Sequence, residues 1–305
     1  MSRSILATRA ALASATVALF LLLLKSYAAS KTGSVAMLGS LADTALDLLA
    51  SLVTLWGVRV AAEPADHDHR FGHGKAEALA ALFQVFIIGL SSVAILARAV
   101  QQLLAGQTTA NAEYGIGVSI IAILATLALL VYQRYVIERT GSVAIGADHV
   151  HYQSDVMLNI AVIAALAIDQ FGGMRGADPL FGIAIALWLM WGAWRASAQA
   201  VDQLMDKEWP AERRAAFMKV AEQHPELAGI HDLRTRTSGT HDFVQFHVWM
   251  DPKITLDDAH RVMDEVEDQL MLAFPGTEIL IHPDPEGHVD RVPISALEAT
   301  TGTIH

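Results

Sequence analysis

Long apolar segments separated by short polar ones occupy the first two thirds of the chain. A helix needs about 20 apolar residues to cross a bilayer. Six segments reach that length, near residues 5–28, 34–62, 76–104, 112–135, 142–170 and 179–204. Because the connections are short, we expect consecutive helices to run antiparallel. The pattern predicts an α-helical membrane domain of six transmembrane helices over residues 1–207.

The pattern changes after residue 207, where helical and strand-like periods alternate. Pro210 begins a predicted helix, and two β-rich segments over 229–237 and 242–250 are joined by a short turn. A second, amphipathic helix and a last short strand over 276–281 follow. This order predicts a cytoplasmic, ferredoxin-like α+β domain over residues 208–285. The weak patterning of residues 286–305 predicts a disordered tail.

The composition is that of a membrane protein with an acidic soluble part. Hydrophobic residues make up 53% of the 305 residues and charged residues only 17%, which is too apolar for an ordinary soluble protein. Most acidic residues follow Asp202, so the net charge of −11 belongs mainly to the soluble part. Nucleic acid is therefore not an expected partner. The chain has no cysteine, which leaves histidine and carboxylate as ligands for any transition metal.

The distribution of basic residues predicts the orientation in the membrane. Lys and Arg are more frequent on the side that holds the N-terminus, and the positive-inside rule assigns that side to the cytoplasm. Arg3 and Arg9 precede the first apolar segment as in a signal peptide, but no small-residue cleavage site followed by polar sequence appears. We therefore expect a retained first helix and both termini in the cytoplasm.

Two of the predicted membrane helices carry ionisable residues with helical spacing. Asp43 and Asp47 lie four residues apart in segment 34–62, and His151 and Asp155 repeat that spacing in segment 142–170. Each pair shares one helical face, and a carboxylate at bilayer depth costs about 2.5–3.5 kcal/mol. Four such ligands on two helices can surround Zn²⁺ or a similar cation. The alternative is a set of protonated or partnered structural residues, which the doubled spacing disfavours.

The loop between the second and third segments is rich in possible metal ligands. Asp66, His69 and His73 are spaced so that a turn could gather them around one cation, and Gly72 and Gly74 allow tight folding of the backbone. An ordinary solvated polar loop is the alternative interpretation.

The soluble domain contains a second group of candidate ligands at strand ends and on the second helix. These residues could converge on one or two metal ions or remain separate surface residues, and the sequence does not decide between the two. The group consists of His231, His247, His260, His282 and Asp284.

Taken together, these motifs resemble the cation diffusion facilitators, and most closely the bacterial branch that exports zinc and ferrous iron. The motifs are Asp43-x3-Asp47, the loop from Asp66 to Lys75, the run from His151 to Asp155, and the segment from His231 to Arg236. The resemblance extends from about residue 10 to residue 284.

The resemblance implies roles that spacing does not show. It implies a homodimer joined mainly through the cytoplasmic domains, a transport site at the two intramembrane pairs, a loop site, and a binuclear cytoplasmic site to which Asp232 is a further candidate ligand. It also implies that Lys75 and Asp206 pair near the dimer contact. Pro283 departs from relatives that carry a polar side chain there. Asp43, where strictly zinc-selective relatives have His, implies a broader range of Zn²⁺, Cd²⁺ and Fe²⁺.

We interpret the chain as a proton-coupled antiporter, not an enzyme, that exports Zn²⁺, Cd²⁺ and Fe²⁺ across the bacterial inner membrane. Protons and metal ions compete for the same ligands, because His151 must be neutral and the aspartates ionised to bind metal. One alternative is a membrane zinc metalloenzyme, but catalytic zinc keeps an open position. The other is a passive channel, but a tight four-ligand site releases its ion too slowly for conduction.

Overall fold

The computed structural model describes residues 3–32, 35–105, 116–172, 177–227 and 229–287. The chain divides into two compact units, Met1–Leu204 and Met205–His305, which are described separately below. The predicted disordered tail lies outside the described residues, apart from its first two positions.

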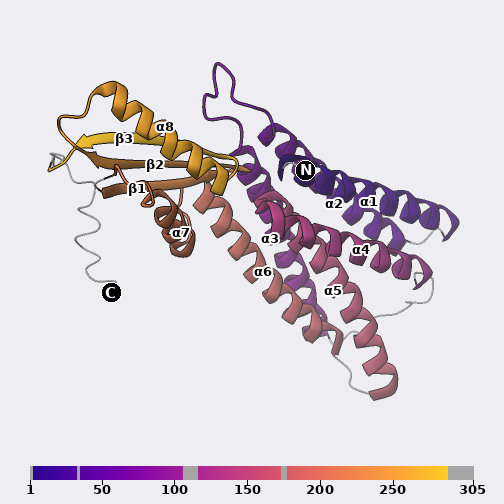
Figure 1. Cartoon of the computed structure of the whole chain (residues 1–305). Coiled ribbons are helices and arrows are strands. Elements are labelled where there is room, and N and C mark those ends of the chain that lie inside the picture. Colours follow the sequence, from indigo (N-terminus) through magenta and orange to yellow (C-terminus); the bar gives the residue numbers. More distant parts are fainter. Residues whose placement is uncertain (1–2, 33–34, 106–115, 173–176, 228, 288–305) are drawn as a thin grey trace. The chain divides into compact units, whose positions relative to one another are not determined.

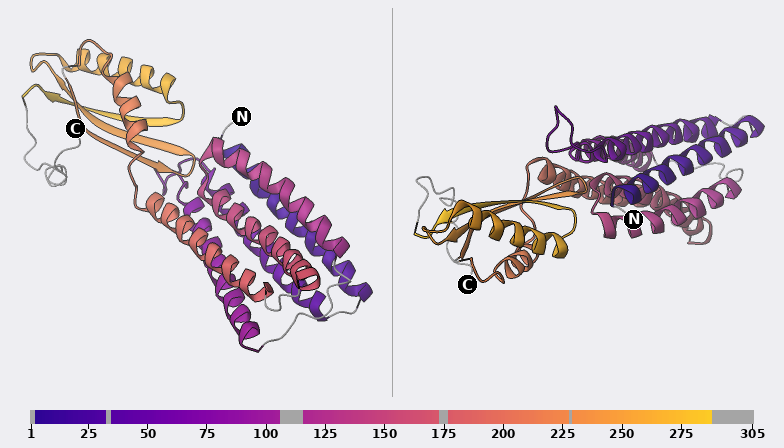
Figure 2. Two further views of the ribbon diagram at one scale, coloured as in Figure 1. Left: turned by 90° about the horizontal axis from the view of Figure 1, so that it is seen from below. Right: turned by 45° about the horizontal axis from the view of Figure 1, so that its top comes forward.

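The first unit is a bundle of long helices that lie side by side (Figures 1 and 2). Within the described ranges, five of them, all but α5, are long and apolar enough to cross a membrane. The prediction of a helical membrane domain is confirmed, whereas a membrane-spanning α5 stays a prediction. The bounds are α1 (Arg3–Thr32), α2 (Val35–Ala61), α3 (Ala76–Ala105), α4 (Ile116–Thr140), α5 (Val143–Gly172) and α6 (Ala177–Leu204).

Small residues let these helices approach closely. Four buried alanines of α1 belong to a core shared with α2, α3, α4 and α5. Gly57 of α2 lies so near α3 that a Cβ placed on it would clash with the Cβ of Ala80. Association of helices in a membrane depends on such close packing. It also brings polar side chains of neighbouring helices within hydrogen-bonding distance.

The junction of α4 and α5 sets the position of the site-bearing helix. The fourth helix ends later than the predicted residue 135, because the left-handed conformation that stops it occurs at Gly141, with φ of 67°. Ser142 then precedes α5 and donates a hydrogen bond of 2.7 Å to Oε2 of Glu77 on α3. Both side chains are buried. The start of α5 is thus tied to α3, two to three turns before His151.

The second unit is a three-stranded sheet with two helices, in the predicted order. The strand order is β1-β2-β3, with β1 antiparallel and β3 parallel to β2. A parallel neighbour requires a crossover, and α8 provides it (Figure 1). The bounds are α7 (Ala211–Ala221), β1 (Gly229–Ser238), β2 (His241–Met250), α8 (Leu256–Ala273) and β3 (Thr277–Pro285).

The two faces of this sheet have different roles. Alternate residues of β2, from Val244 to Met250, join Phe217 of α7 and Leu270 of α8 in one buried core. The residues between them, including His247, therefore point to the opposite face. The last strand is longer than the predicted 276–281, because its pairing with β2 continues as far as Pro285. Prolines are tolerated there since β3 is an edge strand.

Candidate metal centres

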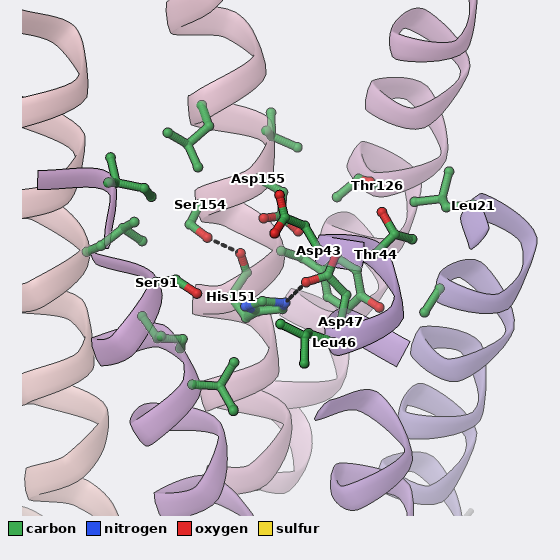
Figure 3. A pocket seen from close by; sticks show the side chains of 18 of the residues that line it. Leu21, Asp43, Thr44, Leu46, Asp47, Ser91, Thr126, His151, Ser154 and Asp155 are labelled. Atoms are coloured by element: carbon green, nitrogen blue, oxygen red, sulfur yellow. Dashed lines mark hydrogen bonds and ion pairs between the residues drawn. The ribbon is translucent and has the colours of Figure 1, made fainter. Parts of the chain in front are cut away.

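A cavity of about 540 Å³ in the membrane unit is lined by residues of several helices. All four ligands predicted for the transport site line it (Figure 3). His151 lies with its Nε2 atom 3.0 Å from Oδ1 of Asp47. One ligand atom each of Asp47, His151 and Asp155 lies within 4.8 Å of the other two. Asp43 shares the cavity but is not part of this closest cluster.

The geometry of the cluster is compatible with a small transition-metal ion. Ligand atoms about 2.1 Å from a tetrahedral zinc ion lie about 3.4 Å from one another. The distance between His151 and Asp47 is 3.0 Å, so small shifts would place the ligands around an ion. His151 is buried, with 4% of its surface exposed, and the two neighbouring carboxylates repel each other whenever both are ionised. A bound cation relieves that repulsion.

Hydrogen bonds within and between helices surround the cluster. Ser51 Oγ and the hydroxyl of Tyr152 lie 2.8 Å apart, and Ser154 donates to the carbonyl of His151 (Figure 3). Lys25 of α1 also lines the cavity, and its Nζ donates to Oγ1 of Thr44 at 2.6 Å. Lys25 was not among the predicted site residues, although a lysine near the end of an apolar segment is visible in the sequence.

The loop between α2 and α3 gathers the three predicted ligands. Oδ1 of Asp66 lies 3.3 Å from His69 Nδ1, and its Oδ2 lies 3.3 Å from His73 Nε2. The backbone hydrogen bond from His69 is the main reason that the pKa of the Asp66 carboxyl is below its ordinary value. Gly72 adopts φ of 74° within the turn, as the spacing of glycines suggested. The ligand atoms lie within 4.8 Å of one another, so this loop can hold a cation.

In the soluble unit, strand register lines up three histidines. His247 on β2 is opposite His231 on β1 and His282 on β3, and Asp284 follows on the same face of β3. Oδ2 of Asp284 lies 2.8 Å from His247 Nδ1 and 3.2 Å from His231 Nε2, and its Oδ1 lies 3.4 Å from His282 Nε2. Ligand atoms of His231, His247 and Asp284 form a cluster within 4.8 Å.

Asp284 is the centre of this group. Burial raises the pKa of its carboxyl, but the hydrogen bond from His247 and the charges of His282, His247 and His231 outweigh it, so the pKa lies below its ordinary value. Asp232 is nearby, with its Oδ2 3.8 Å from His247 Nε2. It sits at a break in the pairing of β1 and β2, with φ of 48°.

His260 does not join the other candidates within one chain. It lies on α8, which packs on the core face of the sheet, whereas the histidine row lies on the opposite face. Its side chain is 70% exposed and 3.7 Å from Asp264. The expectation that all five residues could converge fails for His260 in the single chain, because the two faces of a sheet are separated by its backbone.

Lys75 and Asp206 belong to different units. Lys75 donates to the carbonyl oxygen of Leu204 at the end of α6 at 3.2 Å. Asp206, which adopts φ of 56°, lies 3.6 Å from Nη1 of Arg236. The pairing of Lys75 with Asp206 stays a prediction.

Both units match sequence models of one family. Residues 11–205 match the cation efflux transmembrane domain, and residues 209–286 match the cytoplasmic domain of cation efflux proteins. The chain therefore belongs to the cation efflux family, as its resemblance to the cation diffusion facilitators suggested. Members of this family are transporters and not enzymes.

Individual relatives match over most of the chain. The cation-efflux pump FieF of Serratia proteamaculans is 44% identical over 276 residues, which are 90% of this chain and 92% of the relative. FieF of Cronobacter sakazakii is 41% identical over 94% of this chain and 95% of the relative. A solved chain of the transporter CzrB in a zinc form is 33% identical, covers 28% of this chain and 99% of its own, and has a TM-score of 0.27. This chain is thus a cation efflux transporter that exports divalent metal ions.

Proposed function

We propose that this transporter exchanges cytoplasmic Zn²⁺, and also Cd²⁺ and Fe²⁺, for protons. The observation that carries the proposal is the cluster of Asp47, His151 and Asp155 inside a cavity of the membrane unit. We assign Asp43, which lines the same cavity, as the fourth ligand. One imidazole and three carboxylates suit borderline divalent ions, and geometry discriminates among them more than affinity does.

Competition for these ligands supplies the coupling. Metal binds only when His151 is neutral and the aspartates are ionised. Protons that reach the cavity from the more acidic side displace the ion, and protons that leave toward the cytoplasm restore the site. Rocking of the helices around the site would expose it to each side in turn. A passive channel does not need protons to displace the ion, because its flux depends only on the gradient of the ion.

We also propose that the transporter lies in the bacterial inner membrane, that both of its termini are in the cytoplasm, and that it is a homodimer. The excess of Lys and Arg on the N-terminal side supports the orientation. The match of residues 209–286 to the family's dimer-type cytoplasmic domain supports the homodimer. The cysteine-free chain is a clean background for single cysteines added at either end. A membrane-impermeant thiol reagent should label both ends only from the cytoplasmic side, and labelling from outside would contradict the orientation.

The experiment for the coupling is zinc flux in sealed vesicles with and without a pH gradient. Acidification of the compartment that receives zinc should accelerate zinc flux in the wild type. Asp155→Asn should abolish zinc flux. Glu138→Gln is the matched control, because it removes an exposed carboxylate on α4 whose partner is Arg134. A flux that follows the zinc gradient alone, at any pH gradient, would replace the antiporter with a channel.

A further inference from the structure

A second carboxylate on α5 is buried beside the cluster and has no predicted role. Asp148 lies three residues before His151 and is completely buried. Its Oδ2 accepts a hydrogen bond of 2.8 Å from Nε2 of Gln133 on α4, and its Oδ1 accepts one of 3.3 Å from Nε2 of Gln84 on α3. Both donors are neutral amides. Throughout the described part of the chain, no lysine or arginine forms an ion pair with Asp148.

Hydrogen bonds through Gln133, Ser14 and Tyr152 link the surroundings of Asp148 to α2, the helix that carries Asp43 and Asp47. Nε2 of Gln133 also donates to Oγ of Ser14 at 3.0 Å, and the hydroxyl of Tyr152 donates to the carbonyl of Ser14 at 3.2 Å. The same hydroxyl lies 2.8 Å from Oγ of Ser51, which is one turn after Asp47 on α2. These side chains are all buried. The network therefore reaches from Asp148 to the turn of α2 next to Asp47.

The network can hold Asp148 in either ionisation state. A buried carboxylate with only neutral partners is costly unless a proton or another cation neutralises it. Oε1 of Gln84 is buried and has no hydrogen-bond partner within the described ranges. Rotation of that amide by half a turn exchanges its oxygen and nitrogen. The oxygen would then accept a hydrogen bond from a protonated Asp148, while Gln133 continues to donate to the other carboxyl oxygen.

We propose that Asp148, Gln84 and Gln133 form a proton-binding site, separate from the metal ligands, that releases its proton when a divalent cation binds beside Asp47. The inference rests on the proposed exchange of metal for protons and assigns one of those protons to a particular carboxyl. The positive charge of the metal favours the ionised form of Asp148, and by linkage the proton on Asp148 weakens metal binding by the same factor.

The groups around Asp148 leave it as the proton carrier of this network. The uncharged residues that α1, α2, α3 and α4 present to it are Ser14, Ser51, Gln84 and Gln133, whose side chains do not titrate. On α5, His149 lies with Nδ1 3.2 Å from Oε1 of Gln133, not against the carboxyl. His151, and Asp47 on α2, interact electrostatically with Asp148. A cation bound at the cluster therefore changes the free energy of ionising Asp148.

The test counts the protons released per zinc ion bound by the full-length protein in detergent, by calorimetry in buffers of different ionisation enthalpy. Asp148→Asn should release about one proton fewer per protomer than the wild type, with the same number of zinc ions bound. Asparagine fits the site, because its amide can donate to the rotated Gln84 oxygen and its oxygen can accept from Gln133. Glu138→Gln, the exposed matched control on α4, should release as many protons as the wild type.

The outcomes separate this inference from the proposed function. A wild type that releases no protons on binding zinc would refute proton coupling altogether. A wild type that releases protons, together with an Asp148→Asn variant that releases equally many, would overturn only the role of Asp148.

A measurement on the folded wild type covers the case in which Asp148→Asn does not fold. Infrared difference spectra should show that zinc removes the C=O stretching band of a protonated carboxyl group. Gln84→Leu should shift that band, because the carboxyl loses its acceptor, and Glu138→Gln should leave it unchanged. The absence of such a band, or a band insensitive to Gln84→Leu, would also overturn the inference.

Discussion

Zinc should stabilise the soluble unit when it is produced as a fragment of residues 205–305. That unit has its own buried core, and its candidate ligands come from all three strands of one sheet. An ion bound there ties the strands together and favours the folded form. At a hundredfold excess over Kd the gain is about 2.7 kcal/mol. For a domain of this size, each kcal/mol raises Tm by about 4–8 °C, so a rise of roughly 10–20 °C is expected.

His247→Ala is the decisive change in this fragment. His247 is the middle residue of the histidine row, and its Nδ1 lies 2.8 Å from Asp284. Without zinc, loss of this partly exposed hydrogen bond should cost about 1 kcal/mol. With zinc, the variant should lose most of the additional rise in Tm, because one of three clustered ligands is gone.

Scanning calorimetry with zinc and with a chelator measures both effects. His224→Ala is the control, because His224 pairs with Glu265 away from the cluster and its loss should leave the zinc-dependent rise intact. If His247→Ala kept the full rise, or if the wild-type fragment showed none, the assignment of this cluster as a metal site would be wrong.

Three further predictions concern pH, a buried ion pair and ion choice. The pKa of Asp284 is lowered in the folded state. The ionised carboxylate therefore stabilises the metal-free fragment above pH of about 4, and this stabilisation is lost as the pH falls through the folded-state pKa. Asp284→Asn should therefore flatten the acid limb of stability measured by urea unfolding, and an unchanged limb would contradict this. Arg213→Met should destabilise the fragment by about 3 kcal/mol, because it removes the guanidinium whose Nη2 lies 2.7 Å from Oδ2 of the 1%-exposed Asp242; the exposed Arg261→Met is the control in the same urea titration, and an equal effect of both variants would refute the argument. Asp43→His should narrow vesicle flux toward Zn²⁺ and lose Cd²⁺, since it changes the charge and reach of one ligand, whereas an unchanged ratio of the two rates would count against Asp43 as a ligand.

The intramembrane pairs were predictable because a helix has a fixed period. A spacing of four residues places two side chains on one face whatever surrounds them, and the structure brings Asp47, His151 and Asp155 together. The order of helices and strands in the soluble unit was equally accessible, since turns and periods are local. Both inferences need only the sequence near the residues concerned.

The remaining features depend on how distant segments pack. The row of His231, His247 and His282 depends on strand register, and the separation of His260 depends on which face of the sheet α8 covers. The surroundings of Asp148 depend on packing as well, because nothing in the sequence near it shows that Gln84 and Gln133 of two other helices donate hydrogen bonds to its carboxylate.

The most direct test of the central claim is the coordination of zinc in a full-length protein whose other two clusters have been removed. Asp66→Ala and His247→Ala provide that background, because each removes a ligand of one cluster. X-ray absorption should then show one zinc ion per protomer with one nitrogen and three oxygen ligands, and adding Asp47→Ala should abolish that binding. Zinc bound with the same coordination after Asp47→Ala would contradict the assignment of the transport site.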